Sequence, residues 1–530
     1  MSRTVELGSP LAGCSPEEYC LLSETNQVLR LAIQYSKLQR GPGGNWRGQT
    51  RIDSIATTAE HILMHQALGS NLDKDRDAFI SWFYAVQNSD GSWGINPGDP
   101  GDLSVTVEAY LALRILDLIA HFLSFLKYVL PLRRYALDRS VAFILQTVQE
   151  MGGVGHLSRP PHMAILALKL EGYSVHSRPL RTGLDSIGHF VYEDEDGKRI
   201  SSANTTFRDS SLMITGLEDA GVAADAPWFR NSVQWLQGCL LSDVNNHAFK
   251  AFDTRVRRVD DVSSAIHAII QQNPLMLRSH LVTTALEWLL ERQNSDGGWA
   301  SLGCSETLVR QSTPDVTGHV LETFGLLLTV SRRNRKLVAQ GTLIDHVASA
   351  SRRAIHYLSV TQQPCGAWFG CCTRHHIYAT SAVLRALAYF IGVKERNRWT
   401  ERDDSINDDV SQAIHWFESL HNQDGGWGDI CWREKGEEST ASQTALALLA
   451  LLPYLSPMDS VLRNGVEYLI QTQAKTLPGG ATWTEDQSMR ACSPACTYIS
   501  SSYSSHCFPM MAIGRYVRAL RQYERGADLV

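Results

Sequence analysis

A short glycine–tryptophan motif recurs along the chain and restricts the folds that the chain can adopt. Close copies read QNSDGSWG, QNSDGGWA and HNQDGGWG, and they occupy Gln87–Gly94, Gln293–Ala300 and His421–Gly428. Looser copies occupy Gln362–Gly370 or end at Trp46 and Trp483. Most copies follow one stretch with helical spacing and precede another that is rich in alanine and leucine. Self-similarity of this kind predicts a fold built from stacked repeats.

Each part of the motif has a physical role in joining two helices. Glycine supplies the positive φ of a tight turn. The indole can stack on that turn, while the glutamine amide can hydrogen-bond backbone groups at the next helix end. No strand pattern separates the helical stretches, so the sequence predicts an all-α fold, either a solenoid or a closed α/α barrel. A closed barrel of this kind has a central cavity.

Composition describes an ordinary globular chain. The 530 residues are 44% hydrophobic and 20% charged, and the length suggests two or more domains. A net charge of −6 gives no reason to expect nucleic acid as a partner. Eleven scattered cysteines do not resemble a disulfide framework, which favours a reducing, cytoplasmic location. The sequence leaves a monomer and a homodimer both open.

Membrane segments are not expected from hydropathy. Residues 1–16 lack the apolar centre of a signal peptide. No uncharged apolar run reaches the roughly 18 residues of a membrane span. The nearest approach, Ile115–Leu132, is interrupted by Asp117, His121 and Lys127. We expect that segment to be a buried helix or to dip its apolar face into a bilayer as a peripheral contact.

The repeats, together with four further segments, resemble the squalene–hopene and oxidosqualene cyclase family. Those segments are Gly98–Leu113, Thr313–Gly325, Ser439–Leu451 and His506–Tyr516. Protein prenyltransferase β-subunits also form α/α barrels, but the extra segments favour the cyclases. The resemblance implies two α/α barrels, one inserted in the other. It divides the chain into a catalytic barrel, residues 1–45 and 204–530, and an inserted barrel, residues 46–203.

An acidic pair, Asp260 and Asp261, begins an apolar helical run. Taken alone, the pair fits a helix N-terminus, where negative charge is favoured. The resemblance implies more, because family members protonate an alkene with an aspartic acid in such a segment. It makes Asp260 the proton donor and Asp261 its neighbour. An alkene is a very weak base, so the carboxylate left behind must be stabilised by hydrogen bonds or positive charge.

A second pair, Asp315 and His319, stands one helical turn apart. On its own, this spacing also describes a surface ion pair. The resemblance implies that His319 partners the acid and that Asp315 orients it. We expect a protonated His319 to stabilise the Asp260 carboxylate after proton transfer.

Several positions depart from the family pattern and concern the substrate pocket. The acidic segment of the family reads D-x-D-D, and Arg258 stands here in place of its first aspartate. Arg258 either tunes the acid or pairs with Asp261. Arg208 and Cys372 stand where pocket tryptophans are usual. Retained candidates for the pocket wall are Phe207, Phe249, Trp368 and Tyr378. Aromatic faces stabilise carbocations, so their loss favours a short cascade or a substrate other than squalene.

The function expected from the resemblance is a protonation-initiated terpene cyclase. Its substrate would be a linear, squalene-like isoprenoid, cyclised through carbocations to a product with one or more rings. One alternative is a cyclase for farnesyl or geranylgeranyl diphosphate or for a prenylated meroterpenoid. Another is a non-catalytic isoprenoid-binding barrel.

No cofactor is expected for this chemistry. The sequence has no metal-ligand set that we would assign, and magnesium becomes relevant only for a diphosphate substrate. Asp403–Asp409 faintly resembles a magnesium motif, but we interpret it as a solvated helix start.

Overall fold

The computed structural model describes about two thirds of the chain. The described residues are 16–46, 55–69, 72, 74–88, 93, 109, 112, 141, 145, 159–194, 197–200, 205–241, 258–300, 311–333, 341–370, 376–391, 403–428, 438–477, 479–485 and 503–527. Helices dominate these ranges, and the strands form two short antiparallel hairpins. The predicted all-α class is therefore confirmed.

Inner helices, each packed against the next, close into a ring. They are α8 (Thr206–Asp219), α10 (Val259–Gln272), α12 (Pro314–Arg333), α14 (His376–Leu387), α16 (Ala441–Leu451) and α18 (Ser504–Ala527). Each contacts the next one in this order, and α18 returns to contact α8. The ring is therefore closed, and the inner helices surround one central space.

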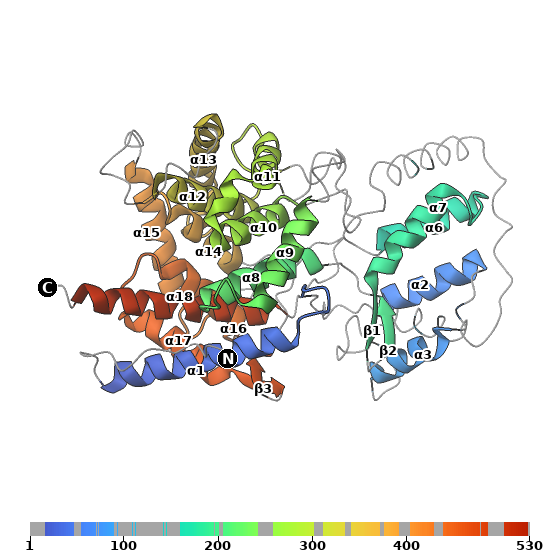
Figure 1. Cartoon of the computed structure of the whole chain (residues 1–530), viewed down its shortest axis with the longest axis horizontal. Coiled ribbons are helices and arrows are strands. Elements are labelled where there is room, and N and C mark those ends of the chain that lie inside the picture. Colours follow the sequence, from blue (N-terminus) through green and yellow to red (C-terminus); the bar gives the residue numbers. More distant parts are fainter. Residues whose placement is uncertain are drawn as a thin grey trace.

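Outer helices alternate with the inner ones along the chain and pack outside the ring (Figure 1). They are α1 (Pro16–Leu38), α9 (Pro227–Leu241), α11 (His280–Glu291), α13 (Gly341–Thr361), α15 (Asp403–Ser419) and α17 (Ser460–Thr472). A short 3₁₀ helix (Pro274–Arg278) links α10 to α11, and β3 (Ala474–Leu477) pairs with β4 (Gly480–Thr482). The alternation of inner and outer helices is the α/α barrel arrangement that the repeats predict.

The glycine–tryptophan motif makes the turns between outer and inner helices. Trp299 is fully buried, and its Nε1–H donates to the Leu289 carbonyl at 2.7 Å. The Gln293 amide donates to the Gly297 carbonyl at 2.8 Å and to the Ala350 carbonyl of α13 at 2.9 Å. The motif thus ties one helix pair to the next. The glutamine amide bonds backbone groups as predicted, although in the turn itself and in the middle of α13 instead of at a helix end. The stacking expected of the indole stays a prediction.

A second group of elements precedes α8. It comprises α2 (Ile55–Leu68), α3 (Arg76–Ala85), α6 (Arg159–Leu170), α7 (Arg178–Ile187), the 3₁₀ turn Gly188–Phe190, and the hairpin of β1 (Val191–Asp194) and β2 (Gly197–Ile200). Its buried apolar residues form two small cores, separate from the large core of the ring. Figure 1 shows these elements beside the ring.

The expected domain boundaries stay a prediction. That division assigns Trp46 to the inserted barrel, but Trp46 packs in the core of the ring. Its indole donates to the Ser36 carbonyl at 2.6 Å, and its backbone N–H donates to Ser210 Oγ at 2.9 Å. Ile115–Leu132 lies outside the described residues. No helix in the described ranges is long and apolar enough to cross a membrane.

Candidate active site

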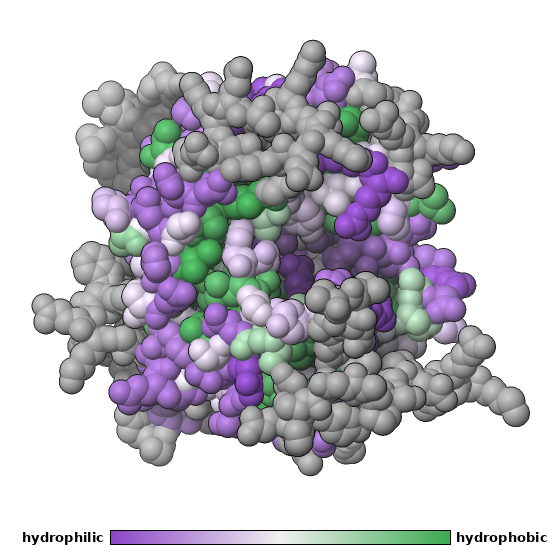
Figure 2. Space-filling view, turned by 90° about the vertical axis from the view of Figure 1, so that its left-hand side faces the viewer, coloured by the Kyte–Doolittle hydropathy of each residue, from purple (hydrophilic) through white to green (hydrophobic). Residues whose placement is uncertain are grey.

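The central cavity of the ring has an empty volume of about 550 Å³, which includes space open to solvent. Inner helices supply its lining, which consists of Arg208, Leu212, Thr215, Asp260, Ser264, His267, His319, Glu322, Thr323, Tyr378, Arg385, Phe508, Met511 and Arg515. Only Leu212, Phe508 and Met511 of these are fully apolar. Figure 2 shows one face of the molecule, with a hollow that has hydrophilic side chains at its depth. The cavity is therefore much more polar than a hydrocarbon pocket.

Asp260 lines this cavity from the first turn of α10. Arg258 is the last residue before α10 and has extended backbone (φ −74°, ψ 137°), so the helix begins directly after it. The apolar side chains of α10 bury one face of the helix, which holds Asp260 at the cavity with only 6% of its surface exposed. The acidic pair thus begins a helix, as the pattern predicts, and one member faces the central space.

Two arginines determine the charge of Asp260. Arg258 contacts both carboxylate oxygens, with Nη2 2.8 Å from Oδ2 and Nε 3.2 Å from Oδ1. Burial alone raises the pKa of Asp260, but Arg258 and then Arg208 outweigh it and hold the pKa at about 2. The carboxylate is therefore ionised near neutral pH in this conformation.

Asp261 has the opposite environment. It is half-buried, its Oδ1 has no hydrogen-bond partner, and burial together with the neighbouring Asp260 raises its pKa to about 6. It is not among the residues that line the cavity. Of the two alternatives left open by the sequence, the geometry favours the first, because Arg258 pairs with Asp260.

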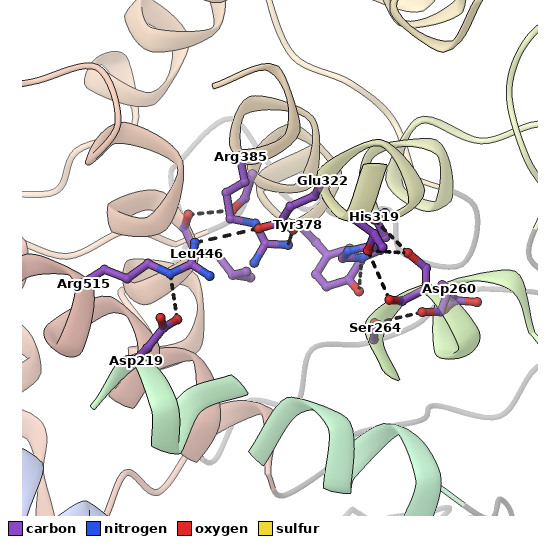
Figure 3. A network of polar contacts seen from close by, with 12 residues as sticks. Asp219, Asp260, Ser264, His319, Glu322, Tyr378, Arg385, Leu446 and Arg515 are labelled. Carbon is purple, nitrogen blue, oxygen red and sulfur yellow. Dashed lines mark hydrogen bonds and ion pairs between the residues drawn. The ribbon is translucent and has the colours of Figure 1, made fainter. Parts of the chain in front are cut away.

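His319 lines the cavity from α12, which packs against α10, and Tyr378 lines it from α14. His319 Nε2 lies 2.9 Å from Tyr378 Oη, and Arg208 Nη2 donates to the same oxygen at 3.1 Å (Figure 3). Arginine can only donate, so the phenol oxygen accepts from Arg208, and its O–H can donate to Nε2 of a His319 that carries its proton on Nδ1. Burial, and then the charge of Arg385, lowers the pKa of His319 to about 4. Burial therefore favours a neutral His319 in this conformation, and the imidazolium expected after proton transfer stays a prediction.

Other predicted site residues fall in different places. Asp315 is buried in the first turn of α12, but it does not line the cavity. Phe207 is half-buried and packs against the ring core without lining the cavity. Phe249 and Cys372 lie outside the described residues.

Trp368 is a correction to the predicted pocket wall. Its indole is fully buried and donates to the Leu358 carbonyl at 2.7 Å. This bond matches that of Trp299 to Leu289. Trp368 is therefore the tryptophan of its repeat copy, and it stabilises the turn instead of lining the cavity.

A charged network that the sequence analysis missed continues along the cavity. Arg385 pairs with Glu322 at 3.1 Å, and Arg515 Nε donates to Asp219 at 2.7 Å. Arg515 Nη1 also lies 3.8 Å from Glu322. Burial raises the pKa of Glu322, but Arg385, His267 and Arg515 reverse this and hold it at about 2. Figure 3 shows the network extending from Asp219 and Arg515 at one end to Asp260 at the other.

A seven-residue spacing in the sequence could have indicated part of this network. His267 follows Asp260 by seven residues, and Arg385 follows Tyr378 by seven, which is two helical turns on one face. Glu322 lies one turn after His319. Within the described part of the chain, no three His, Cys, Asp or Glu side chains are arranged to hold a metal ion.

Comparisons with known proteins give the family. The model of the squalene–hopene cyclase C-terminal domain matches residues 301–518, and that of the N-terminal domain matches residues 29–121 and 115–196. Enfumafungin synthase of Hormonema carpetanum is 26% identical over 95% of this chain and 51% of its own length. Squalene hopane cyclase of Aspergillus fumigatus is 26% identical over 83% of this chain and 84% of its own.

A bacterial relative is also similar. Squalene–hopene cyclase of Alicyclobacillus acidocaldarius is 28% identical over 74% of this chain and 63% of its own length. This chain therefore spans about half of enfumafungin synthase and under two thirds of the bacterial enzyme. The two domain models together account for most of the chain, in the order expected for such a cyclase. The chain belongs to the squalene–hopene cyclase family.

Proposed function

We propose that this protein is a terpene cyclase that starts its reaction by protonating the terminal alkene of a linear isoprenoid. The observation that carries the proposal is the position of Asp260, a buried carboxyl group that lines the cavity of a closed helical ring. Relatives named as cyclases of squalene to hopene or hopane support the reaction class.

Asp260 is the proposed acid. In the first step its O–H bond breaks, the π electrons of the alkene form a new C–H bond, and a carbocation remains on the neighbouring carbon. The negative charge left on Asp260 lies beside the guanidinium groups of Arg258 and Arg208, which stabilise it. Successive alkenes then attack the cation, and deprotonation or water capture ends the cascade.

The surroundings of the acid have supporting roles in this proposal. Tyr378 and His319 hold Arg208 near Asp260 through their hydrogen bonds. Tyr378 and Phe508 present aromatic rings to the cavity, 6.4 Å apart between centroids, and can stabilise passing cations. No redox cofactor has a step in this reaction, and magnesium would be needed only with a diphosphate substrate. We place the protein in the cytoplasm, with a peripheral membrane contact for uptake of an apolar substrate.

One observation favours a second candidate, a non-catalytic isoprenoid-binding barrel. The Arg258–Asp260 ion pair occupies both carboxylate oxygens and keeps the acid ionised. A carrier has no use for a protonated carboxyl group, whereas an enzyme must open or protonate this pair during its cycle.

The test is incubation of the purified protein with squalene, oxidosqualene, farnesyl diphosphate and geranylgeranyl diphosphate, with and without magnesium. Products are identified by gas chromatography and mass spectrometry, after phosphatase treatment for the diphosphates. We expect a cyclic product that is lost in Asp260→Asn and retained in Asp345→Asn, which changes an exposed carboxyl group of α13. Ligand binding without any cyclic product supports the carrier, and a product that survives Asp260→Asn means that another group is the acid.

A further inference from the structure

The cavity lining falls into two layers. Lining residues lie seven positions apart on α8 (Arg208 and Thr215), on α10 (Asp260 and His267) and on α14 (Tyr378 and Arg385). Seven residues make about two helical turns, so each pair lies on one face with its members about 10 Å apart along the axis. We call Arg208, Asp260, His319, Tyr378 and Phe508 the acid layer. We call His267, Glu322, Arg385 and Arg515 the distal layer.

Positive side chains outnumber negative ones among the distal-layer residues that line the cavity. Arg385 and Arg515 line it together with a single carboxylate, Glu322. His267 adds no charge near neutral pH, because burial lowers its pKa. Glu322 pairs with Arg385, whereas Arg515 pairs with Asp219, which does not line the cavity. Arg518 pairs with the same Asp219 carboxylate and does not line the cavity either.

This arrangement suits a substrate with an anionic end. A purely hydrocarbon chain would have to replace water around these charged side chains and return no hydrogen bond, which is costly. Arginine forks, in contrast, match the oxygens of carboxylates and phosphates. The side chain of Arg515 is 24% exposed and lines the cavity, so an incoming oxygen can reach it.

We propose that the distal layer binds the anionic head group of the isoprenoid substrate, with Arg515 and Arg385 as its ligands. This inference rests on the proposed function, because it assigns the two ends of one substrate to two layers of one cavity. The terminal alkene lies at Asp260, and the head group, a phosphate-type or carboxylate group, lies two helical turns away.

The chain offers a matched pair of arginines for the test. Arg515 and Arg518 both pair with Asp219 from α18, but only Arg515 lines the cavity. Replacement of Arg515 leaves Asp219 with Arg518 and with the Gln271 amide, which donates to it at 3.0 Å. We therefore expect Arg515→Gln to fold, and a thermal melt checks this.

The experiment is calorimetric titration of the full chain without magnesium, using farnesyl diphosphate, farnesoic acid and farnesol. The hydrocarbon is the same in the three probes, so only the head group differs. We expect at least one anion to bind more tightly than farnesol, and Arg515→Gln to weaken that anion roughly tenfold or more, the usual effect of losing a charged hydrogen bond. Farnesol binding should not change, and Arg518→Gln should bind each probe like the wild type.

The three probes also identify the head group, and their results distinguish a failure of this inference from a failure of the proposed function. Tight binding of the diphosphate alone assigns a phosphate-type head group, and tight binding of the acid alone assigns a carboxylate. Equal affinities for all three probes, or equal losses in the Arg515 and Arg518 variants, overturn the inference even if a cyclic product forms. Arg515-dependent binding of an anion without any cyclic product overturns the cyclase and keeps the head-group site.

A second variant covers the case in which Arg515→Gln does not fold. Arg515→Lys keeps the charge beside Asp219 but removes the planar fork. We expect it to weaken binding of the preferred anion several-fold and to leave farnesol unchanged. An unchanged affinity for that anion would contradict the assignment of Arg515 as a ligand.

Discussion

Arg258 contacts both carboxylate oxygens of Asp260 at the start of α10, at 2.8 and 3.2 Å. The guanidinium group stabilises the carboxylate, so the acid is strong once it carries a proton. The same contact keeps its pKa at about 2, so only a small fraction is protonated near neutral pH. In the proposed reaction, Arg258 therefore makes Asp260 a stronger acid but leaves less of it protonated, and the pH dependence of turnover should show both effects.

We expect Arg258→Gln to move the pH profile of cyclisation upward. Without the nearest positive charge, burial raises the pKa of Asp260, and the acid stays protonated to a higher pH. The pH at which kcat/KM falls to half should increase by about one unit or more. Initial rates across a pH series measure this, on whichever substrate gives a product.

Arg258→Lys is the control for that change, because it keeps the charge but loses the two-point contact. Its profile should lie between those of the wild type and Arg258→Gln. If all three profiles coincide, the ionisation of Asp260 does not limit the reaction.

His319 should make folding stability depend on pH. Its pKa is lowered to about 4 in the folded chain, compared with about 6.5 for a free histidine. The unfolded state therefore binds the proton more readily, so stability falls as pH decreases from 6.5 to 4. A difference of this size corresponds to about 3 kcal/mol.

His319→Gln removes this dependence and can still accept the hydrogen bond from Tyr378. Chemical denaturation at several pH values should give a shallower slope for the variant than for the wild type between pH 4 and 6.5. His346→Gln, an exposed position on α13, is the control and should retain the wild-type slope. Equal slopes for all three proteins would mean that His319 is not buried as a neutral ring.

The repeats could be predicted from sequence because their physics is local. A glycine turn and a glutamine amide act within a few residues of each other, and the structure confirms this at Gln293, whose amide donates to the Gly297 carbonyl. Trp368 shows the limit of pattern reasoning. It stands in a repeat copy, yet the family resemblance predicts it in the pocket wall.

The charged network could not be predicted in the same way, because its members are distant in sequence. Asp219 and Arg515 are almost 300 residues apart and meet only because α18 closes the ring against α8. The protonation state of His319 also depends on the fold, since burial and Arg385 determine it. The sequence thus predicts candidate residues for the chemistry, whereas ring closure determines their charges.

We expect the loss of one member of the buried Glu322–Arg385 pair to lower the free energy of unfolding much more than replacement of both members by apolar residues. Both side chains are less than 9% exposed, and the charged atoms lie 3.1 Å apart. Glu322→Met leaves the arginine charge buried without its main partner, and such losses cost about 3–5 kcal/mol. The double variant Glu322→Met with Arg385→Met should recover most of this loss, because no unpaired charge remains.

Urea denaturation of the wild type, both single variants and the double variant gives the coupling energy between the two positions. Additive losses, with the double variant less stable than either single variant, would mean that the two charges do not compensate each other.

The turn of the repeat should tolerate no side chain at Gly297. Its φ is +92°, and an added Cβ would lie 2.5 Å from the Arg353 carbonyl oxygen of α13. Gly221 has a similar φ of +86°, but an added Cβ there meets no atom within 4 Å. Gly221→Ala should therefore cost only the backbone strain, about 1–2 kcal/mol. Gly297→Ala carries the same strain and must also push α13 away from the motif, so its loss of unfolding free energy should be clearly larger. Thermal and urea denaturation of both variants measure the difference, and equal losses would mean that α13 does not pack against this turn.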